Sequence, residues 1–542
     1  MIFKFAVSCF AAALGLVSAA GTEVWTASPM VRVTPSSRFP DDAGREISLS
    51  LARRERESAQ ILVTCGADAG LSAVVLEIEP LRGKDGRSFS GAVKWDRVGY
   101  VPRVSGAGPH PDVAAPEERW LPDPLLPSGP FAVERGFTQG VWITVYASPD
   151  AEAGRYYSEI RVRQGEKILA SVPFTVRVRN FSLRRTFALD TAFSLMDGFM
   201  RRKYPDGWRK MKKQAIDVML DHRLNPDDIS RTSPPELEDL LHARERGMSR
   251  FNILNIVPEP AGNTLWVCSA SPGKVFNDGF YRTFSNRLRP YLEKLKAHGL
   301  DRLAYIYGFD ECRAEYYAGI DILWRKLKAD FPGLPMMTTT TLFRDFARGK
   351  TNSFDCVTTD WYCPVISHYN IAAADRLRSR GKKVWWYVCN SPPHPYAGLA
   401  SLEYPPVEGR ILLGFLTYLR RADGFLYWHV NNWRGEAHPL MDETKCHFER
   451  WEMKNRLGMP GDGILLYPGT EHILPSIRLA NIRDGEEDYE YLVLAEAALG
   501  REKVAALVRK CVSSPTKFSR SASELSELRE RLAEAVEASL NY

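Results

Sequence analysis

A chain of 542 residues is longer than a single hydrophobic core normally serves, so two or three domains are expected. With 44% hydrophobic and 25% charged residues, the composition is that of a globular protein and excludes a disordered one. The formal net charge is +6, and the excess of Lys and Arg is spread along the chain without the concentrated basic stripe typical of nucleic-acid binding. We therefore expect no nucleic-acid partner.

The first residues, MIFKFAVSCFAAALGLVSAAG, have the order of a secretory signal peptide. Lys4 precedes an apolar run, and the small residues Ser18, Ala19 and Ala20 follow it. We predict that residues 1–20 are a signal peptide cut after Ala20, which removes Lys4 and lowers the net charge from +6 to +5. The mature protein is then periplasmic or secreted. No other stretch is long and apolar enough to span a membrane.

The cysteines and histidines give no indication of a metal or cofactor site. One of the 9 Cys lies in the predicted signal peptide, and the others are scattered without metal-ligand spacing. The 10 His are equally dispersed and contain no HExxH motif. We expect no cofactor, no metal and mostly buried free thiols, with one or two disulfides as the alternative.

Residues 21–182 have the pattern of an all-β domain. In VPFTVRVRN, the residues Val172, Phe174, Val176 and Val178 alternate with other residues and therefore share one face of a strand. Pro and Gly residues mark turns between such runs. The pattern predicts a β-sandwich over 21–182, followed by a linker at RNFSLRRT (179–186).

After Phe187 strand-like and helix-like stretches alternate. About eight such alternations fill a span of about 250 residues, which is the usual size of a (β/α)8 TIM barrel. We therefore predict a TIM-barrel catalytic domain over 187–470, with a doubly wound open sheet as the alternative. No glycine-rich phosphate motif follows the first strand, so a dinucleotide-binding fold has no support. Residues 471–542 are predicted to be helical and to pack on the barrel; Ser521 and Glu524 form a capping box there.

An acidic pair follows the fourth predicted barrel strand, RLAYIYG. Asp310 and Glu311 then lie at the carboxyl end of that strand, where barrel active sites are built. Another acidic pair, Asp442 and Glu443, shows that adjacency alone is common, and a pair of this kind can also simply favour the positive end of the following helix. The aromatic residues at the ends of neighbouring strands favour a functional interpretation.

Adjacency of the two carboxylates restricts the chemistry. Most glycosidases place two carboxylates on opposite sides of the scissile bond, roughly 5 to 9.5 Å apart and usually on separate strands. Neighbouring residues, with Cα atoms about 3.8 Å apart, approach a sugar from one side. This arrangement suits substrate assistance, in which the 2-acetamido oxygen of the sugar attacks the anomeric carbon. One carboxylate then steadies the acetamido group, and the other protonates the departing oxygen.

Further candidates come from the ends of the later strands. A tyrosine hydroxyl is needed to bond the acetamido oxygen, and flat aromatic rings stack on sugars. The candidate substrate-binding residues are Tyr362, Tyr387, Trp361, Trp386, Trp428, Trp433, Asn431 and Asp360.

The chain resembles glycoside hydrolase family 123. In the first domain the resemblance lies in LARRERESAQILVT, LPDPLLP and GVWITVYASPDAEAGRYYSEIRV; in the second it lies in YIYGFDE, KKVWWYVCNSPPHPY and RILLGFLTYLRRADGFLYWHVNNW. It implies a β-sandwich, a TIM barrel and β-N-acetylgalactosaminidase activity by substrate assistance, with a glycan or glycoconjugate as substrate. It also implies that Asp310 stabilises the acetamido group and that Glu311 is the acid/base.

One position departs from the family pattern, because Cys312 stands where Pro is expected after the pair. Two alternatives remain open on the sequence: a glycosidase that acts on a non-acetylated sugar, and a non-catalytic carbohydrate-binding surface protein.

Overall fold

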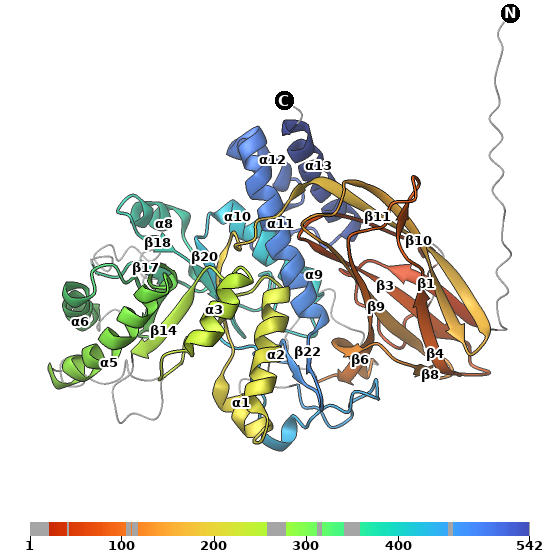
Figure 1. Cartoon of the computed structure of the whole chain (residues 1–542), viewed down its shortest axis with the longest axis horizontal. Helices are drawn as coiled ribbons and strands as arrows, with labels where there is room; N and C mark the ends of the chain where they lie inside the picture. The colour runs from red at the N-terminus through yellow and green to blue at the C-terminus, as the bar shows by residue number, and fades with distance from the viewer. Residues whose placement is uncertain are drawn as a thin grey trace, which may run out of the picture.

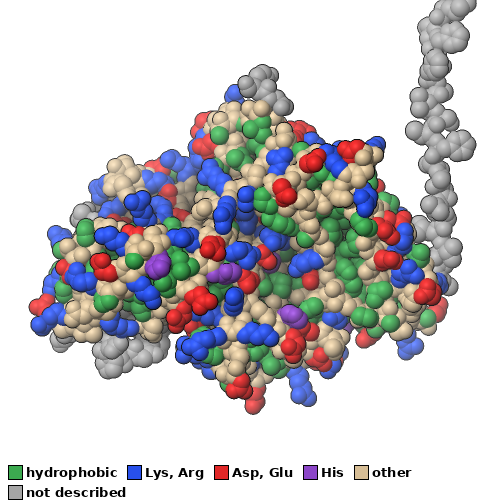
Figure 2. Space-filling view, viewed as in Figure 1, with side chains coloured by type: hydrophobic (Ala, Val, Ile, Leu, Met, Phe, Trp, Pro, Cys, Tyr) green, Lys and Arg blue, Asp and Glu red, His purple; other side chains and the backbone are tan. Residues whose placement is uncertain are grey.

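The computed structural model of the chain describes residues 21–38, 40, 43–104, 110, 118–256, 278–311, 317–340, 358–453 and 459–540. The predicted signal peptide and Cys312 lie outside the described residues. The molecule is multidomain: a β-rich part on the right of Figure 1 stands beside a part in which helices surround parallel strands, and helix α11 (Ile477–Leu499) runs between them. Figure 2 shows charged side chains of both signs over the visible face.

The β-rich part consists of two sheets that share one core. The first has the strand order β1-β3-β9-β6-β7, and the second β2-β11-β10-β4-β8 with β5 beside β10. All pairings are antiparallel except β2 with β11. The strands are β1 Thr22–Ala27, β2 Ile47–Arg53, β3 Arg56–Cys65, β4 Leu71–Ile78, β5 Arg82–Gly83, β6 Gly91–Pro102, β7 Trp120–Pro127, β8 Phe131–Val133, β9 Thr138–Ala147, β10 Gly154–Gln164 and β11 Lys167–Ser182.

Alternating apolar residues build this core. Val172, Phe174, Val176 and Val178 of β11 are buried, as predicted, and one hydrophobic cluster joins them to Val141 and other residues of the facing sheet. The predicted linker at 179–186 is wrong in its first half, because β11 continues to Ser182. The reason is that Phe181 is buried and the buried Arg179 side chain forms ion pairs with helix α13 (Ala522–Ser539), so the chain is held in the sheet.

Parallel strands form the second part. Their pairing runs β14-β15-β16-β17-β18 in one sheet and β13-β12-β20-β19 in another. The strands are β12 Asp190–Ser194, β13 Pro226–Asp227, β14 Phe251–Ile256, β15 Ala304–Gly308, β16 Met336–Thr339, β17 Trp361–Cys363, β18 Lys383–Val384, β19 Trp386–Val388 and β20 Gly424–Tyr427.

The stretch 383–388 links the two sheets. Only Trp385 separates β18 from β19, and β18 pairs with β17 while β19 pairs with β20. The Trp385 amide donates a hydrogen bond to the carbonyl of Tyr362, and the Tyr387 amide donates one to the carbonyl of Pro364. The stretch 383–388 therefore stays bonded to β17 and the residue after it along most of its length. Every pairing among these strands is parallel, so their carboxyl ends lie at one edge.

Helices cover these strands. They are α1 Asp197–Lys203, α2 Trp208–Asp221, α3 Leu237–Glu245, α5 Asp278–Ala297, α6 Tyr317–Asp330, α8 Ile371–Arg378, α9 Val407–Ile411, the π-helix η6 Leu412–Leu416 and α10 Thr417–Arg420. In α5 one face packs inward, since Phe284, Leu288 and Leu295 are buried. Short 3-10 turns lie at Asp301–Leu303, Ile366–His368 and Gly435–Ala437.

The last part of the described chain contains α11, α12 (Arg501–Val508) and α13 (Ala522–Ser539), with the short hairpins β21 Tyr467–Pro468 with β22 Ile473–Leu474 and β23 Val512–Ser514 with β24 Lys517–Phe518. Ser521 caps α13 as predicted, because its hydroxyl accepts a hydrogen bond from the Glu524 amide at 3.4 Å. The face Leu525, Leu528, Leu532 and Val536 is buried.

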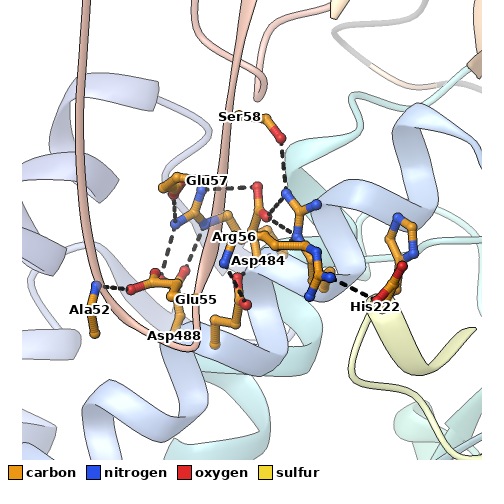
Figure 3. Close-up of polar contacts among 12 residues, drawn as sticks. Ala52, Glu55, Arg56, Glu57, Ser58, His222, Asp484 and Asp488 are labelled. Carbon is orange, nitrogen blue, oxygen red and sulfur yellow. Dashed lines mark hydrogen bonds and ion pairs between the residues drawn. The ribbon is translucent and has the colours of Figure 1, made fainter. Parts of the chain in front are cut away.

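A buried ionic network joins the β-rich part to α11 (Figure 3). Arg410 of α9 pairs with Asp488 of α11 at 2.6 Å and with Glu57 of β3 at 3.3 Å. Glu55, in the turn between β2 and β3, accepts hydrogen bonds from Tyr491 at 2.7 Å and from Arg529 of α13. The Glu55 carboxylate of this turn therefore pairs with a cation of the last helix.

The five described cysteines, Cys65, Cys363, Cys389, Cys446 and Cys511, are free thiols, as expected for most of the cysteines. Two are buried and three are partly exposed. Within the described ranges no helix has both the length and the apolar character needed to cross a membrane.

Candidate active site

The acidic pair lies in a tight turn at the carboxyl end of β15. All five residues of β15 are buried, and the turn follows at once. Phe309 and Glu311, which flank Asp310, have left-handed backbone with φ of 59° and 50°. Such conformations cost about 1–3 kcal/mol each and persist only where neighbours hold them. Here Thr338 of β16 donates to the Phe309 carbonyl at 2.8 Å.

Two hydroxyl groups hold the Asp310 carboxylate. Tyr307 donates to Oδ1 at 2.6 Å and Thr339 donates to the same oxygen at 2.7 Å. Burial and the charge of Asp310 raise the pKa of Tyr307 well above its usual value, so its hydroxyl remains a donor. Thr339 also accepts the Glu311 amide hydrogen at 2.8 Å, and so it fixes both acidic residues at the end of β16.

Glu311 has different surroundings. The hydroxyl of Tyr387, in β19, donates to its Oε1. Removal of water by the surrounding protein raises the pKa of Glu311, and the negative charge of Asp310 raises it further, while the bond from Tyr387 lowers it. Glu311 nevertheless remains exposed as a residue, so a ligand can reach it. A reachable carboxyl group with a raised pKa is suited to donate a proton.

Residues after β19 and β20 stand on another side of the pair. Burial and then the charges of Asp462, Glu311 and Asp310 raise the pKa of the Cys389 thiol to about 12. Asp462 in turn accepts hydrogen bonds from Trp428 at 3.0 Å and from Tyr427 at 2.9 Å. Cys389 and the half-buried Trp428 pack against the cluster that contains Tyr307 and Tyr387, the two tyrosines that bond the acidic pair.

The structure does not bring Asp360 and Trp361 to the acidic pair. Asp360 precedes β17, binds the amide of Met336, the first residue of β16, at 3.0 Å, and pairs with Lys328 at 2.5 Å. Thr339, the last residue of β16, is the one that touches Asp310, about 10 Å further along the strand. The prediction for Asp360 is wrong because β17 begins after this residue and not before it.

Trp361 packs against residues of the neighbouring parallel strands. It stacks on Trp385 at 5.5 Å and contacts Tyr305 at 5.3 Å. Arg250 and Lys383 lie over its ring, and both pair with Asp190, the first residue of β12. Trp361 is therefore a core residue at the amino ends of the strands, not a sugar platform.

Tyr362 and Trp386 face the covering helices. Tyr362 is buried in the hydrophobic cluster between strands and helices, whereas its neighbours Trp361 and Cys363 belong to the inner cluster. Trp386 is fully buried and donates to Thr417 of α10 at 3.2 Å. Because side chains alternate along a strand, the inner positions fall to Trp385 and Tyr387 instead.

Trp433 and Asn431 have structural contacts. Trp433 is 1% exposed and donates to the Leu466 carbonyl at 2.8 Å. Asn431 is buried and bonds both the amide and the carbonyl of Met196 at 3.0 and 3.1 Å, which ties the segment after β20 to the segment after β12. Of the eight predicted binding residues, Tyr387 contacts the acidic pair, and Trp428 packs against the cluster that contains Tyr307 and Tyr387.

The comparisons with known proteins fit this geometry. A family model described as "Glycoside hydrolase 123, catalytic domain" matches residues 280–495. The chain carries a glycoside hydrolase 123 catalytic domain. The matched range contains β15, β16, β19 and β20, with Asp310, Glu311 and Tyr387 among its residues. The protein is therefore a glycoside hydrolase that acts on glycans.

One solved structure shows the fold over nearly the whole chain. A family 123 glycoside hydrolase from Clostridium perfringens is similar over 96% of this chain and 97% of its own, with a TM-score of 0.68 and 14% sequence identity. A family 39 glycoside hydrolase from Bacteroides cellulosilyticus WH2 covers 81% of each chain, with a TM-score of 0.34 and 10% identity. The comparison with curated proteins finds no match.

Three residues of the hydrolase site were not predicted: Tyr307, Thr339 and Asp462. Tyr307 stands in β15, three residues before Asp310, and its alternation with Ile306 is a signal that it faces inward. Thr339 lies in a run of four threonines, and identical residues do not indicate which of them face inward. Asp462 follows a Gly in the loop GDG, without a strand to indicate its position. Across the described residues, no group of three His, Cys, Asp or Glu side chains could hold a metal ion.

Proposed function

We propose that the protein is a β-N-acetylgalactosaminidase that uses the 2-acetamido group of its substrate as the nucleophile. The observation that carries the proposal is the contrast within one turn: Asp310 accepts two hydroxyl hydrogens on Oδ1, while its neighbour Glu311 has a raised pKa and contact with solvent. Two adjacent carboxylates with different surroundings suit two different tasks on one side of a sugar.

In this mechanism Asp310 orients the acetamido group and stabilises the positive charge that develops as the oxazolinium ion forms. Tyr307 and Thr339 fix the carboxylate in place for this task. Glu311 gives its proton to the departing glycosidic oxygen and then takes a proton from water, which opens the oxazolinium ion with overall retention. The hydrogen bond from Tyr387 orients the Glu311 carboxyl group. Because this hydroxyl lies beside the acidic pair, we expect it to bond the acetamido oxygen once the substrate is bound.

We also propose that the parallel strands close into one eight-stranded TIM barrel, with 383–388 counted as one strand. Support comes from the pairing of this stretch on both sides and from the contact between β13 and β14, where the Asn252 amide donates to Asp227 at 2.9 Å. Trp428 is then the candidate sugar platform at the barrel mouth, because it is half-buried beside Asp462. The lysine, apolar and small-residue order of residues 1–20 supports export of the enzyme.

The test is a comparison of nitrophenyl glycosides with the purified mature chain. We expect hydrolysis of the β-N-acetylgalactosaminide and at least about 100-fold slower hydrolysis of the β-galactoside, because the latter lacks the internal nucleophile. Equal hydrolysis of both would indicate a protein nucleophile and a non-acetylated sugar. Binding without hydrolysis of either would instead indicate a carbohydrate-binding protein.

A further inference from the structure

A cavity opens at the carboxyl ends of β12 and β13. It has a volume of about 500 Å³ and lies between the segment Leu195–Arg202, the loop 226–236, α2 and α3. β12 ends at Ser194 and β13 at Asp227, so the cavity lies at the same edge of the parallel strands as the acidic pair. Asp227, in its lining, accepts a hydrogen bond from Tyr305 of β15 at 2.7 Å, which connects the cavity to the strand that ends at the acidic pair. We call this cavity the β12–β13 pocket.

Most charged side chains of the pocket neutralise one another. Lys212 pairs with Asp197 at 3.2 Å and with Asp239 at 2.9 Å. Arg231 pairs with Asp227 at 3.5 Å. Two further guanidinium groups, of Arg201 and Arg202, line the pocket, and within the described part of the chain neither has an ion pair with a carboxylate. The α1 side of the pocket therefore carries two positive charges without a paired acid.

Aromatic rings hold both guanidinium groups. The Cζ atom of Arg202 lies 4.4 Å from the ring centroid of Phe199, and that of Arg201 lies 4.2 Å from the ring centroid of Trp208. Stacking restricts the plane of a guanidinium group and leaves its N–H donors free at the edge. Such planar donors recognise the two oxygens of a carboxylate or a sulfate ester together. Lys and Arg side chains, with Asp and Glu among them, gather near α1 and α2 in the lower part of Figure 2.

The pocket also adjoins the catalytic side of the molecule. Phe199, in its lining, packs edge-to-face against His429 at 4.9 Å, and His429 packs in the same way against Trp428 at 5.3 Å. Burial, then the charges of Arg434 and Arg202, lower the pKa of His429 to about 3, so this ring is neutral and Arg202 lies close to it. One glycan can therefore extend from the region of Trp428 to Arg202.

We propose that the β12–β13 pocket binds an anionic group, a carboxylate or a sulfate ester, on the part of the glycan next to the cleaved sugar. Asp228 and Glu236 line the opposite side, in the loop 228–236, so the anion is placed at Arg201 and Arg202. The hydrolase would then select acidic glycans over neutral ones. This inference rests on the proposed function, since it takes the cleaved sugar to be N-acetylgalactosamine.

Binding to the Glu311→Gln variant tests the proposal without turnover. Calorimetric titrations would compare three disaccharides in which β-N-acetylgalactosamine is linked to position 4 of glucuronic acid, of glucose or of glucose 6-sulfate. We expect at least one acidic ligand to bind about tenfold more tightly than the glucose disaccharide, as charge-assisted bonds to guanidinium groups imply. The arm that gains affinity identifies carboxylate or sulfate as the ligand group.

Two matched variants assign this preference to the pocket. Arg201→Gln with Arg202→Gln should bring the ratio of acidic to neutral affinity to about one. Arg201→Lys with Arg202→Lys should keep part of the preference for acidic ligands. Arg209→Gln is the control, because Arg209 also stacks on Trp208, at 4.7 Å, but is not part of the lining. Equal affinity for all three ligands, or a preference that survives the double Gln variant, would overturn the proposal. Failure of the proposed hydrolysis is seen separately, in the nitrophenyl assay.

Discussion

At the scale of single residues, Asp310 and Glu311 show how neighbours in sequence acquire different chemistry. Asp310 meets the hydroxyls of Tyr307 and Thr339, whereas Glu311 meets Tyr387 and the charge of Asp310. The left-handed backbone on both sides of Asp310 makes these separate environments reachable within one turn. The pKa of Glu311 is therefore set by identifiable contacts, each of which a substitution can remove.

The pH dependence of kcat/KM on an alkyl β-N-acetylgalactosaminide follows from these contacts. As an acid, Glu311 must be protonated, so activity is lost as the pH rises through its raised pKa. Tyr387→Phe removes the bond that lowers this pKa, and the basic limb should move to higher pH. Asp310→Asn removes a charge that raises it, and the limb of the residual activity should move to lower pH. Tyr157→Phe, on the exposed sandwich surface, is the control. Shifts in the same direction for both variants would argue against Glu311 as the acid.

At the scale of elements, β16 positions the turn that follows β15. Its last residues, Thr338 and Thr339, bond the Phe309 carbonyl, the Asp310 carboxylate and the Glu311 amide. β16 therefore determines where the two acidic groups lie, through hydrogen bonds to the turn. The two strands pair in parallel, so this support comes from the carboxyl end of the adjacent strand.

Thr339→Val tests this support. The change keeps the shape but removes one hydrogen bond to Asp310 and one from the Glu311 amide, so kcat should fall about 10- to 100-fold while KM changes less. Thr358→Val is the matched control, since that hydroxyl bonds Asp321 of α6 at 2.5 Å. A loss of stability equal to that of the control, with kcat unchanged, would show that Thr339 has no positioning role.

At the scale of the whole molecule, buried charges join the β-rich part to the helices behind the parallel strands. Arg410, Glu57, Asp484 and Asp488 lie within one network, and all of them are buried. The turn between β2 and β3 adds Glu55 to it (Figure 3). Separation of the two parts would break these ion pairs and leave the charges without their partners. We therefore expect the two parts to unfold together.

Arg410→Met measures this coupling. Removal of this cation takes one ion-pair partner from each of the buried Glu57, Asp484 and Asp488 side chains, and the free energy of unfolding in urea should fall by about 3–5 kcal/mol. Arg376→Met, at an exposed position of α8, should change it by about 0.5 kcal/mol or less. If the two variants lose equal stability, the network contributes no more than surface charge does.

Strong periodic patterns in the sequence predict much of this architecture. They do not predict which side chains of a short strand face inward. The alternation of Val172 to Val178 and the helix face of Leu525 to Val536 are realised, because each pattern is long enough to fix its own phase. β17 has only three residues, so sequence alone could not decide whether Trp361 or Tyr362 faces inward. Partners across strands, such as Thr339, depend on register between segments far apart in the chain.

Inhibition by the thiazoline analogue of N-acetylgalactosamine tests the central claim, catalysis by the substrate's own acetamido group, most directly. This compound mimics the cyclic intermediate, so it should inhibit competitively and bind far more tightly than the substrate. Asp310→Asn should weaken that inhibition, because the charge that stabilises the mimic is lost. No inhibition by the thiazoline, together with cleavage of 2-hydroxy sugars as fast as 2-acetamido sugars, would contradict the account.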